Sequence, residues 1–220
     1  MMKSLILMSA AVLAVACNAE VKKSSTPVVE GDRIVLVTPP AKEGLTVNEA
    51  LSLRSSSREY TSEPLTLEEL SGVMWAAAGV NRADGKLTAP SALALYPVKV
   101  YAFLPGGVYL YDSAAHSLVR VVEGDLRALS ARQPFAEKAA LNIAYIADTE
   151  VYAGRDIPAE HVRFLCGQDA AGYAENVNIY AAGHGLKAIT RGSAQDAEML
   201  AALGLDPERY VFVLAQTVGK

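Results

Sequence analysis

Residues 88–104 read TAPSALALYPVKVYAFL, an irregular loop with proline and serine that leads into a long apolar segment. The apolar part, Tyr96–Leu104, is rich in β-branched and aromatic residues and predicts a strand. A Pro-Ser loop that enters a strand can present backbone N–H and C=O groups to a flat heterocycle, and an ordinary connecting loop is the alternative interpretation. The stretch therefore predicts part of a sheet, preceded by a candidate binding loop at Pro90, Ser91 and Ala92.

Other apolar segments predict the rest of the sheet. Gly106-Gly107 turns the chain back after the first strand, and a turn at Asp112–His116 separates the next two. Strands are predicted over 108–111, 118–122, 141–147, 186–190 and 210–218, with the early ones joined as a meander. Strands connected through short turns run antiparallel. A mostly antiparallel sheet is therefore expected.

Helices are predicted between these strands. Thr46–Glu49 and Thr66–Glu69 both have the spacing of a capping box, in which the threonine caps the helix and the glutamate reaches back. They predict a helix over 47–53 and a second one that ends at Gly79. A long helix is expected from Pro158 to Ala182 or Gly183, with Gly167 and Gly172 as points of interruption, and a short one over 196–203. The fold class is α+β, a central mostly antiparallel sheet flanked by helices in one domain.

Composition excludes several classes of protein. The 220 residues are 51% hydrophobic and 20% charged, which allows a substantial core. The net charge is −4 without basic runs, so we expect no nucleic-acid partner. Two cysteines exclude a disulfide scaffold, and the three histidines, His116, His161 and His184, show no metal-ligand spacing. No metal site is predicted.

The first 16 residues have the features of a secretory signal peptide. Lys3 is their only charge, and the apolar run that follows is too short to span a bilayer. The run ends Ala14-Val15-Ala16-Cys17, close to the lipobox in which a small residue precedes a cysteine that becomes lipidated. We expect cleavage before Cys17 and its lipidation; ordinary cleavage after Ala16 or Ala19 is the alternative. The protein would be exported, periplasmic or held at a bacterial membrane through its N-terminal lipid only.

A tether is expected after the signal peptide, over residues 17–43. Lys22-Lys23-Ser24-Ser25-Thr26-Pro27 and Pro39-Pro40 are typical of such a segment. The apolar, largely β-branched Ile34–Val37 predicts a short strand within it. Residues 44–220 are then the folded domain, and loss of the leader with Lys3 leaves 19 basic and 24 acidic residues, a net charge of −5.

Two further segments are candidate anion sites. Arg54-Ser55-Ser56-Ser57-Arg58, called the RSSSR segment below, offers many donors and no carboxylate, which suits a phosphate and a polyol. A solvated turn is the alternative. Arg191 lies between a predicted strand and the next helix, where an anion site and a surface salt bridge are equally compatible with the sequence. Cys166, Trp75 and His184 are interpreted as structural residues.

Taken together and in this order, these segments resemble the FMN-dependent nitroreductases, in particular the short members that include the thiazoline/oxazoline dehydrogenases of peptide-modifying clusters. The resemblance covers about Thr46–Lys220. The matching pieces are Leu53–Tyr60 (the family's RRSxRxF/Y motif), Leu67–Leu70 leading into Met74–Gly79, Thr88–Tyr101 (PSAxxxYPxxxY), Asn176–Leu186 and Ala215–Gly219.

The resemblance implies a nitroreductase-like fold with FMN held at the interface of an intertwined homodimer. Carried over by position, the phosphate and ribityl contacts are Arg54, Ser55, Ser56 and Arg58, and the isoalloxazine edge is lined by Pro90, Ser91 and Ala92. Arg191 or Lys220 would complete the phosphate clamp. No protein nucleophile is implied, because the flavin carries the hydride and the protein orients it.

The activity that the resemblance implies is an FMN-dependent oxidoreductase that uses ping-pong hydride transfer. Its substrates would be small, flat and electron-poor, such as nitroaromatics or quinones. An exported reductase would not meet the cytoplasmic NAD(P)H pool, so electrons from a membrane carrier are one alternative. A flavin-dependent dehydrogenase or oxidase of heterocycle-bearing substrates is another, and a ligand-binding surface lipoprotein without turnover is the third hypothesis.

Overall fold

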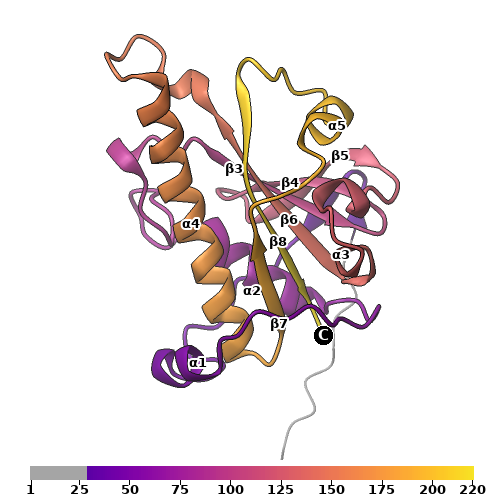
Figure 1. Ribbon diagram of the computed structural model, residues 1–220. Coiled ribbons are helices and arrows are strands. Elements are labelled where there is room, and N and C mark those ends of the chain that lie inside the picture. Colours follow the sequence, from indigo (N-terminus) through magenta and orange to yellow (C-terminus); the bar gives the residue numbers. More distant parts are fainter. Residues whose placement is uncertain (1–28) are drawn as a thin grey trace, which may run out of the picture.

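An antiparallel sheet of eight strands forms the centre of the computed structural model, which describes residues 29–220. The strand order is β1-β2-β5-β4-β3-β6-β8-β7; Figure 1 labels β3 to β8 among these strands. The strands are β1 (Val29–Glu30), β2 (Arg33–Val35), β3 (Val98–Leu104), β4 (Gly107–Asp112), β5 (Ser117–Glu123), β6 (Leu141–Asp148), β7 (Lys187–Arg191) and β8 (Tyr210–Gly219). The predicted fold class is confirmed.

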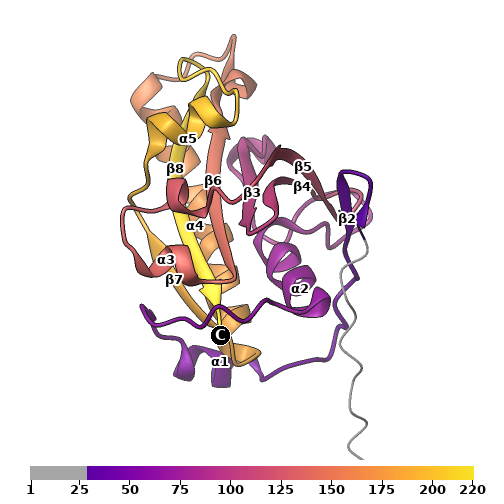
Figure 2. The same cartoon turned by 90° about the vertical axis from the view of Figure 1, so that its right-hand side faces the viewer.

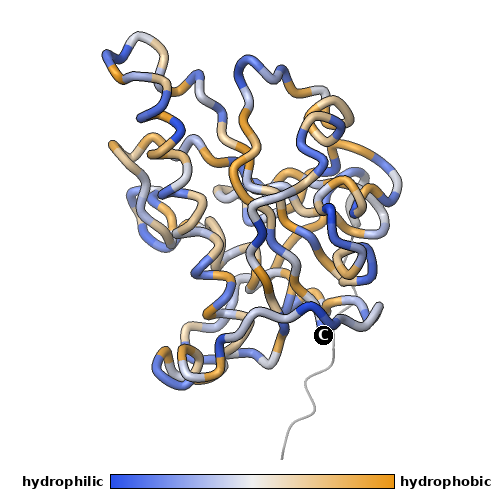
Figure 3. The backbone as a smooth tube through the Cα atoms, viewed as in Figure 1, coloured by the Kyte–Doolittle hydropathy of each residue, from blue (hydrophilic) through white to orange (hydrophobic). Residues whose placement is uncertain are grey.

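Both faces of the central strands are largely buried, so their sequences are mostly apolar. In β3, Val100 and Ala102 belong to the larger core cluster, whereas Tyr101 and Phe103 belong to the cluster on the opposite face. This alternation follows from the two-residue period of a strand. In Figure 3 the strands at the centre are mainly orange and the outer loops mainly blue.

Helices cover the two faces unequally. α1 (Val47–Leu53), α2 (Leu67–Ala78) and the long α4 (Ala159–Gly183) lie on one side, where α2 and α4 supply the α-helical residues of the larger cluster. α3 (Phe135–Lys138) and α5 (Asp196–Ala202) lie on the other side, toward the viewer in Figure 2, with α4 seen behind the strands. Short 3-10 turns complete the fold: η1 (Ala92–Ala94), η2 (Arg127–Ser130) and η3 (Thr149–Tyr152).

The predicted helix ends are confirmed. Both capping boxes are formed, with Thr46 accepting from the amide of Glu49 and Thr66 from that of Glu69. Gly79 is the C-cap of α2. α4 runs without interruption through Gly167 and Gly172, because burial of one side of the helix against the sheet outweighs the low helix propensity of glycine.

The segment predicted as a tether is partly built into the sheet. The short strand expected near Ile34 is found as β2, which pairs with β1 on one side and β5 on the other. Residues 29–35 are therefore a hairpin at the sheet edge. The predicted signal peptide, residues 1–16, and Cys17 lie outside the described residues. Within residues 29–220, no helix combines the length and the apolarity needed to cross a membrane.

Candidate cofactor site

The RSSSR segment is attached to the outer edge of the sheet. Arg54 is the C-cap of α1, and the chain then runs beside β7, the last strand of the sheet. Ser56 forms a parallel bridge with Ala188, and the amide of Ser57 donates to the carbonyl oxygen of Ala188 at 3.0 Å. The backbone of the segment is thereby held in place while its side chains remain outside the sheet.

The two arginine side chains of this segment are accessible to a ligand. The side chains of Arg54, Ser55, Ser56 and Arg58 are exposed. Neither Arg54 nor Arg58 forms an ion pair with any residue in the described part of the chain. Two free guanidinium groups beside hydroxyls form a donor set for a phosphate and a polyol. The residues present fit the phosphate and ribityl of FMN.

A cavity of about 380 Å³ adjoins Arg58. It is lined by Arg58, Glu59, Tyr60, Pro134, Phe135 and Lys138. The rings of Tyr60 and Phe135 stack with their centroids 6.1 Å apart, and the Tyr60 hydroxyl donates to the carbonyl oxygen of Ser57 at 2.9 Å. Burial raises the pKa of Tyr60, so its phenol is neutral at physiological pH. Sequence reasoning missed Lys138, which adds a positive charge beside Arg58.

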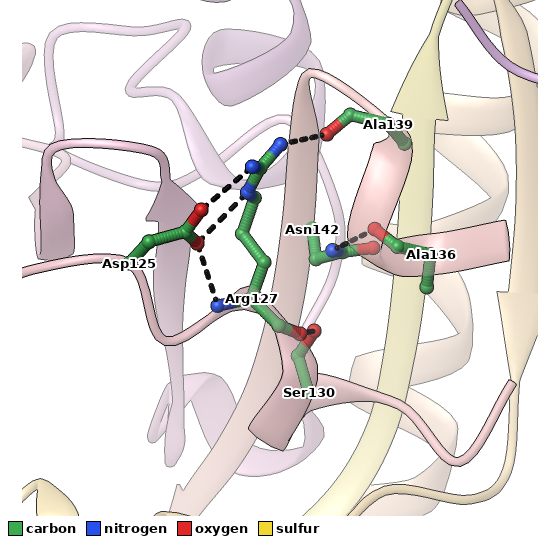
Figure 4. Close-up of polar contacts among 6 residues, drawn as sticks. All are labelled: Asp125, Arg127, Ser130, Ala136, Ala139 and Asn142. Atoms are coloured by element: carbon green, nitrogen blue, oxygen red, sulfur yellow. Dashed lines mark hydrogen bonds and ion pairs between the residues drawn. The ribbon is translucent and has the colours of Figure 1, made fainter. Parts of the chain in front are cut away.

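Hydrogen bonds within residues 125–142 fix the position of α3 (Figure 4), which supplies Phe135 and Lys138 to the cavity lining. Arg127 binds the carboxylate of Asp125 at 2.7 Å and donates to the carbonyl oxygen of Ala139, also at 2.7 Å. The side-chain amide of Asn142, on β6, donates to the carbonyl oxygen of Ala136 at 2.8 Å. These bonds hold both ends of the short helix that carries Phe135 and Lys138.

Lys220 lies near the RSSSR segment but is already paired. The amide of Thr61, three residues after Arg58, donates to the carbonyl oxygen of Lys220 at 2.9 Å. The Lys220 Nζ is 2.6 Å from Glu63 Oε1 and 3.3 Å from Glu69 Oε2. The hydrogen bond to Glu63 raises the pKa of Lys220. Its charge is therefore shared with two carboxylates.

Arg191 points into the protein and not toward a ligand. It is 5% exposed, and its guanidinium donates to Ser130 O at 2.7 Å, Thr217 Oγ1 at 3.1 Å and Asn142 Oδ1 at 3.3 Å. Burial lowers the pKa of Arg191 to about 10, which still leaves it charged at neutral pH. We therefore correct the expectation that Arg191 binds phosphate or forms a surface salt bridge: its donors are used by interior oxygens.

The loop of Pro90, Ser91 and Ala92 is hydrogen-bonded on its inner side to a residue that sequence reasoning missed. Asp169, on α4, accepts hydrogen bonds from the Ser91 hydroxyl at 2.5 Å and from the Ala92 amide at 3.1 Å. Pro90 is exposed, whereas Ser91 and Ala92 are half-buried. The Ser91 hydroxyl and the Ala92 amide are occupied by Asp169, so only the solvent-facing side of the loop is available to a ligand.

One protomer does not bring the two predicted halves of the site together. The loop is bound to Asp169, in the middle of α4, whereas α1 lies beside Gly183 at the C-terminal end of that helix and leads into the RSSSR segment (Figure 1). The 14 residues between these positions correspond to about 21 Å of helix. Within one chain the two predicted parts of the site therefore lie beside different parts of α4.

An apolar groove runs between α1, α2 and α4. Its cavity of about 480 Å³ is lined by residues that include Leu45, Val47, Trp75, Ile179 and Tyr180. Trp75, interpreted as a core residue, lies at the wall of this groove and is partly buried. His184 also lines the groove; it is the C-cap of α4, as interpreted, and stacks on Tyr180 with ring centroids 3.8 Å apart.

Cys166 and the histidines supply no reactive cluster. Cys166 is 2% exposed, and burial raises the pKa of its thiol to about 11, as expected for a structural residue. Among residues 29–220, no three His, Cys, Asp or Glu side chains are grouped so that they could hold a metal ion.

Comparison with known proteins shows the family to which this arrangement belongs. The sequence profile of the Nitroreductase family matches residues 51–220. A candidate nitroreductase of Methanocaldococcus jannaschii is 33% identical over 183 residues, which cover 77% of this chain and 89% of the relative. This chain is a member of the nitroreductase family.

Solved structures agree with this assignment. The crystal structure of a candidate nitroreductase from Ralstonia eutropha has a TM-score of 0.80 and 33% identity, over 89% of this chain and 93% of that one. A candidate nitroreductase of Desulfovibrio desulfuricans, solved in complex with FMN, has a TM-score of 0.57 and 23% identity. It covers 80% of this chain and 87% of its own, and shows that the fold is shared.

Proposed function

We propose that this chain binds FMN and acts as an oxidoreductase that transfers hydride by a ping-pong mechanism to nitroaromatic or quinone-like substrates. The observation that carries the proposal is the RSSSR segment, whose two arginines have no ion-pair partner among residues 29–220 and stand beside hydroxyl groups. Membership of the nitroreductase family and the FMN complex of the Desulfovibrio relative support it.

The FMN phosphate is assigned to Arg54 and Arg58, with Ser55 and Ser56 toward the ribityl chain. A charge-assisted hydrogen bond stabilises a complex by about 1.5–3 kcal/mol, so the two arginines would together contribute about 3–6 kcal/mol to the binding of a dianion. Two lysines add positive charge near these arginines. Lys138 lines the cavity that adjoins Arg58, and the backbone of Lys220 is hydrogen-bonded to Thr61, three residues after Arg58.

The complete site is assigned to a homodimer. Pro90, Ser91 and Ala92 of one protomer would line the isoalloxazine of the flavin held by the RSSSR segment of its partner, because the two parts are too far apart within one chain. Unusually exposed apolar side chains support a second copy as the partner: Val47 is 64% exposed, Leu53 59% and Leu51 49%. With the apolar groove these side chains make α1 and its surroundings an exposed apolar surface, and such surfaces mark sites of contact with another protein.

FMN, when bound, supplies the hydride acceptor and donor of the reaction. The chain itself would bind the phosphate, orient the ring through the 90–92 backbone, and leave one flavin face open for a flat substrate. No side chain is required as a nucleophile.

We further propose that the protein is exported and lipidated at Cys17, as the lipobox-like sequence predicts. Mass spectrometry of the mature N-terminus tests this: a diacylglyceryl-cysteine supports it, and an unmodified N-terminus or an uncleaved leader contradicts it. In an exported protein, electrons from a membrane carrier are the alternative to NAD(P)H, and bound flavin that NADPH does not bleach in the titration below would favour such a donor.

An absorption spectrum of residues 18–220, incubated with FMN and then titrated anaerobically with NADPH, tests the function. Bound flavin that bleaches and is reoxidised by a nitroaromatic or a quinone supports the proposal. Bound flavin that bleaches only with a heterocycle-bearing substrate favours the dehydrogenase or oxidase reaction. A protein that binds no flavin contradicts both and leaves a binding lipoprotein on this fold.

A further inference from the structure

A buried carboxylate lies directly under the loop 90–96. Asp169 faces the interior from α4 and is only 4% exposed. Its two oxygens accept hydrogen bonds from the Ser91 hydroxyl and the Ala92 amide, at 2.5 and 3.1 Å. It forms no ion pair with any residue between 29 and 220. A buried polar group is unfavourable unless it is hydrogen-bonded, and the Ser91 hydroxyl and the Ala92 amide are the groups that satisfy the Asp169 oxygens.

The loop that Asp169 binds has a strained backbone. Leu93, Ala94 and Tyr96 have φ angles of 56°, 54° and 49°, in the left-handed region that favours glycine. Such conformations persist only where surrounding contacts impose them, and they occur preferentially at binding sites. The Ser91 hydroxyl also accepts a 2.9 Å hydrogen bond from the Tyr96 amide. Ser91 thus ties both ends of the turn to Asp169.

The outer side of the same loop remains available. Pro90 and Ala94 are exposed, and Leu93 is 63% exposed although it is a large apolar side chain. The inner contacts with Asp169 therefore fix the conformation of the loop, while its exposed side chains remain available for contact with a ligand or another protein.

We propose that Asp169 is the positioning residue for the flavin-facing loop: by accepting from Ser91 and Ala92 it holds residues 91–96 in the shape that meets the isoalloxazine of the partner's site. Asp169 does not itself contact the flavin. The inference rests on the proposed flavin site, since only there does the shape of this loop have a function.

The test compares Asp169→Asn with Asp148→Asn. The first substitution keeps the size of the side chain but places an N–H₂ or a neutral oxygen against the Ser91 hydroxyl. Asp148 is a matched control, because it is a similarly buried carboxylate, 6% exposed, that is bound to Arg209 and lies outside the loop. A second pair, Ser91→Ala and Ser91→Thr, removes or keeps the hydroxyl and leaves the Asp169 side chain in place.

Two measurements distinguish an effect on the loop from an effect on the flavin. Amide hydrogen exchange at Ala92 and Tyr96, in flavin-free protein, reports the shape of the loop. We expect Asp169→Asn and Ser91→Ala to speed it by about 10-fold or more, as loss of a hydrogen bond to a charged group implies. Ser91→Thr and Asp148→Asn should leave it unchanged. In flavin-loaded protein, the midpoint potential of the bound flavin should shift only in Asp169→Asn and Ser91→Ala.

Unchanged exchange at Ala92 and Tyr96 in both loop variants would overturn the positioning role. Faster exchange with a wild-type flavin potential would overturn the link between the loop and the flavin. If the wild-type protein binds no flavin, the proposed function fails and this link fails with it, while the exchange data still report whether Asp169 holds the loop.

Discussion

The amide of Ser57 donates a hydrogen bond of 3.0 Å to the carbonyl oxygen of Ala188, and this bond joins the RSSSR segment to the outermost strand of the sheet. The parallel bridge between Ser56 and Ala188 reinforces it. Main-chain groups therefore position the segment, and its arginine side chains do not contribute to the core. Binding and stability are separable here, which makes the arginines suitable for mutation.

Arg54→Ala and Arg58→Ala should each weaken FMN binding by about 10- to 100-fold, because each removes a charge-assisted contact to the phosphate. Both side chains are exposed, so the free energy of unfolding should change by less than about 0.5 kcal/mol. Quenching of flavin fluorescence measures the affinity, and urea unfolding the stability. Arg163→Ala, at an exposed position on α4, is the control and should bind FMN normally. Wild-type affinity in the Arg54/Arg58 double variant would contradict the phosphate assignment.

Glu63→Gln should strengthen FMN binding several-fold. Glu63 accepts a 2.6 Å hydrogen bond from the Lys220 Nζ, and removing its charge leaves more of the lysine's charge for a nearby phosphate. In the same titration, Lys220→Ala should weaken binding and abolish the effect of Glu63→Gln. If Glu63→Gln binds FMN like the wild type, Lys220 serves as an ion-pair partner of Glu63 and Glu69 only.

Local sequence patterns were sufficient for most of the secondary structure but not for the inner contacts of the site. Thr46–Glu49 and Thr66–Glu69 form capping boxes through contacts three residues apart, which any single sequence displays. Asp169 is different: its partners, Ser91 and Ala92, lie more than 75 residues away. The one available signal was a carboxylate within the apolar stripe of α4, between Val162 and Tyr173.

The contacts of Arg191 also could not be predicted from the local sequence. A lone arginine between a strand and a helix has the same local sequence whether it faces solvent or the core. Only the sheet register, which places Asn142 opposite Thr217 on neighbouring strands, brings their oxygens to its guanidinium. The α3 segment was missed because its four residues have no periodicity, and its position depends on Arg127 and Asn142.

Asp148→Asn should reduce stability at neutral pH but not in acid. Arg209 binds both oxygens of Asp148, at 2.8 and 2.6 Å, and lowers the pKa of that carboxyl below the unfolded value of about 3.9. The stabilisation is therefore complete above the unfolded pKa and is lost as the pH falls through the folded pKa.

We expect a loss of about 1 kcal/mol at pH 7, because Arg209 is partly solvated and remains hydrated in the variant. Urea unfolding at pH 7, 5 and 3 should give a difference from wild type that is equal at pH 7 and 5 and smaller at pH 3. Asp156→Asn, at an exposed carboxylate, is the control. A difference that grows toward low pH would contradict the assignment of Arg209 as the stabilising partner.

Gly72→Ala should destabilise the protein although alanine is the better helix former. A Cβ at Gly72, on α2, would lie 1.8 Å from the Tyr180 hydroxyl oxygen and 2.2 Å from its Cζ, so the ring on α4 would have to move. That ring stacks on His184 at a centroid distance of 3.8 Å, which restricts where it can go. Overpacking of this kind costs about 1–3 kcal/mol and exceeds the gain of about 1 kcal/mol in helix propensity.

Gly167→Ala is the matched control, because Gly167 lies inside α4 and a Cβ there meets no atom within 4 Å. It should keep or raise the melting temperature, whereas Gly72→Ala lowers it by several degrees. Tyr180→Ala combined with Gly72→Ala should remove the penalty that Gly72→Ala adds, since the clashing ring is gone. If Gly72→Ala is as stable as Gly167→Ala, then α2 and α4 are not in close contact at this position and the wall of the apolar groove is less rigid than the packing of Tyr180 indicates.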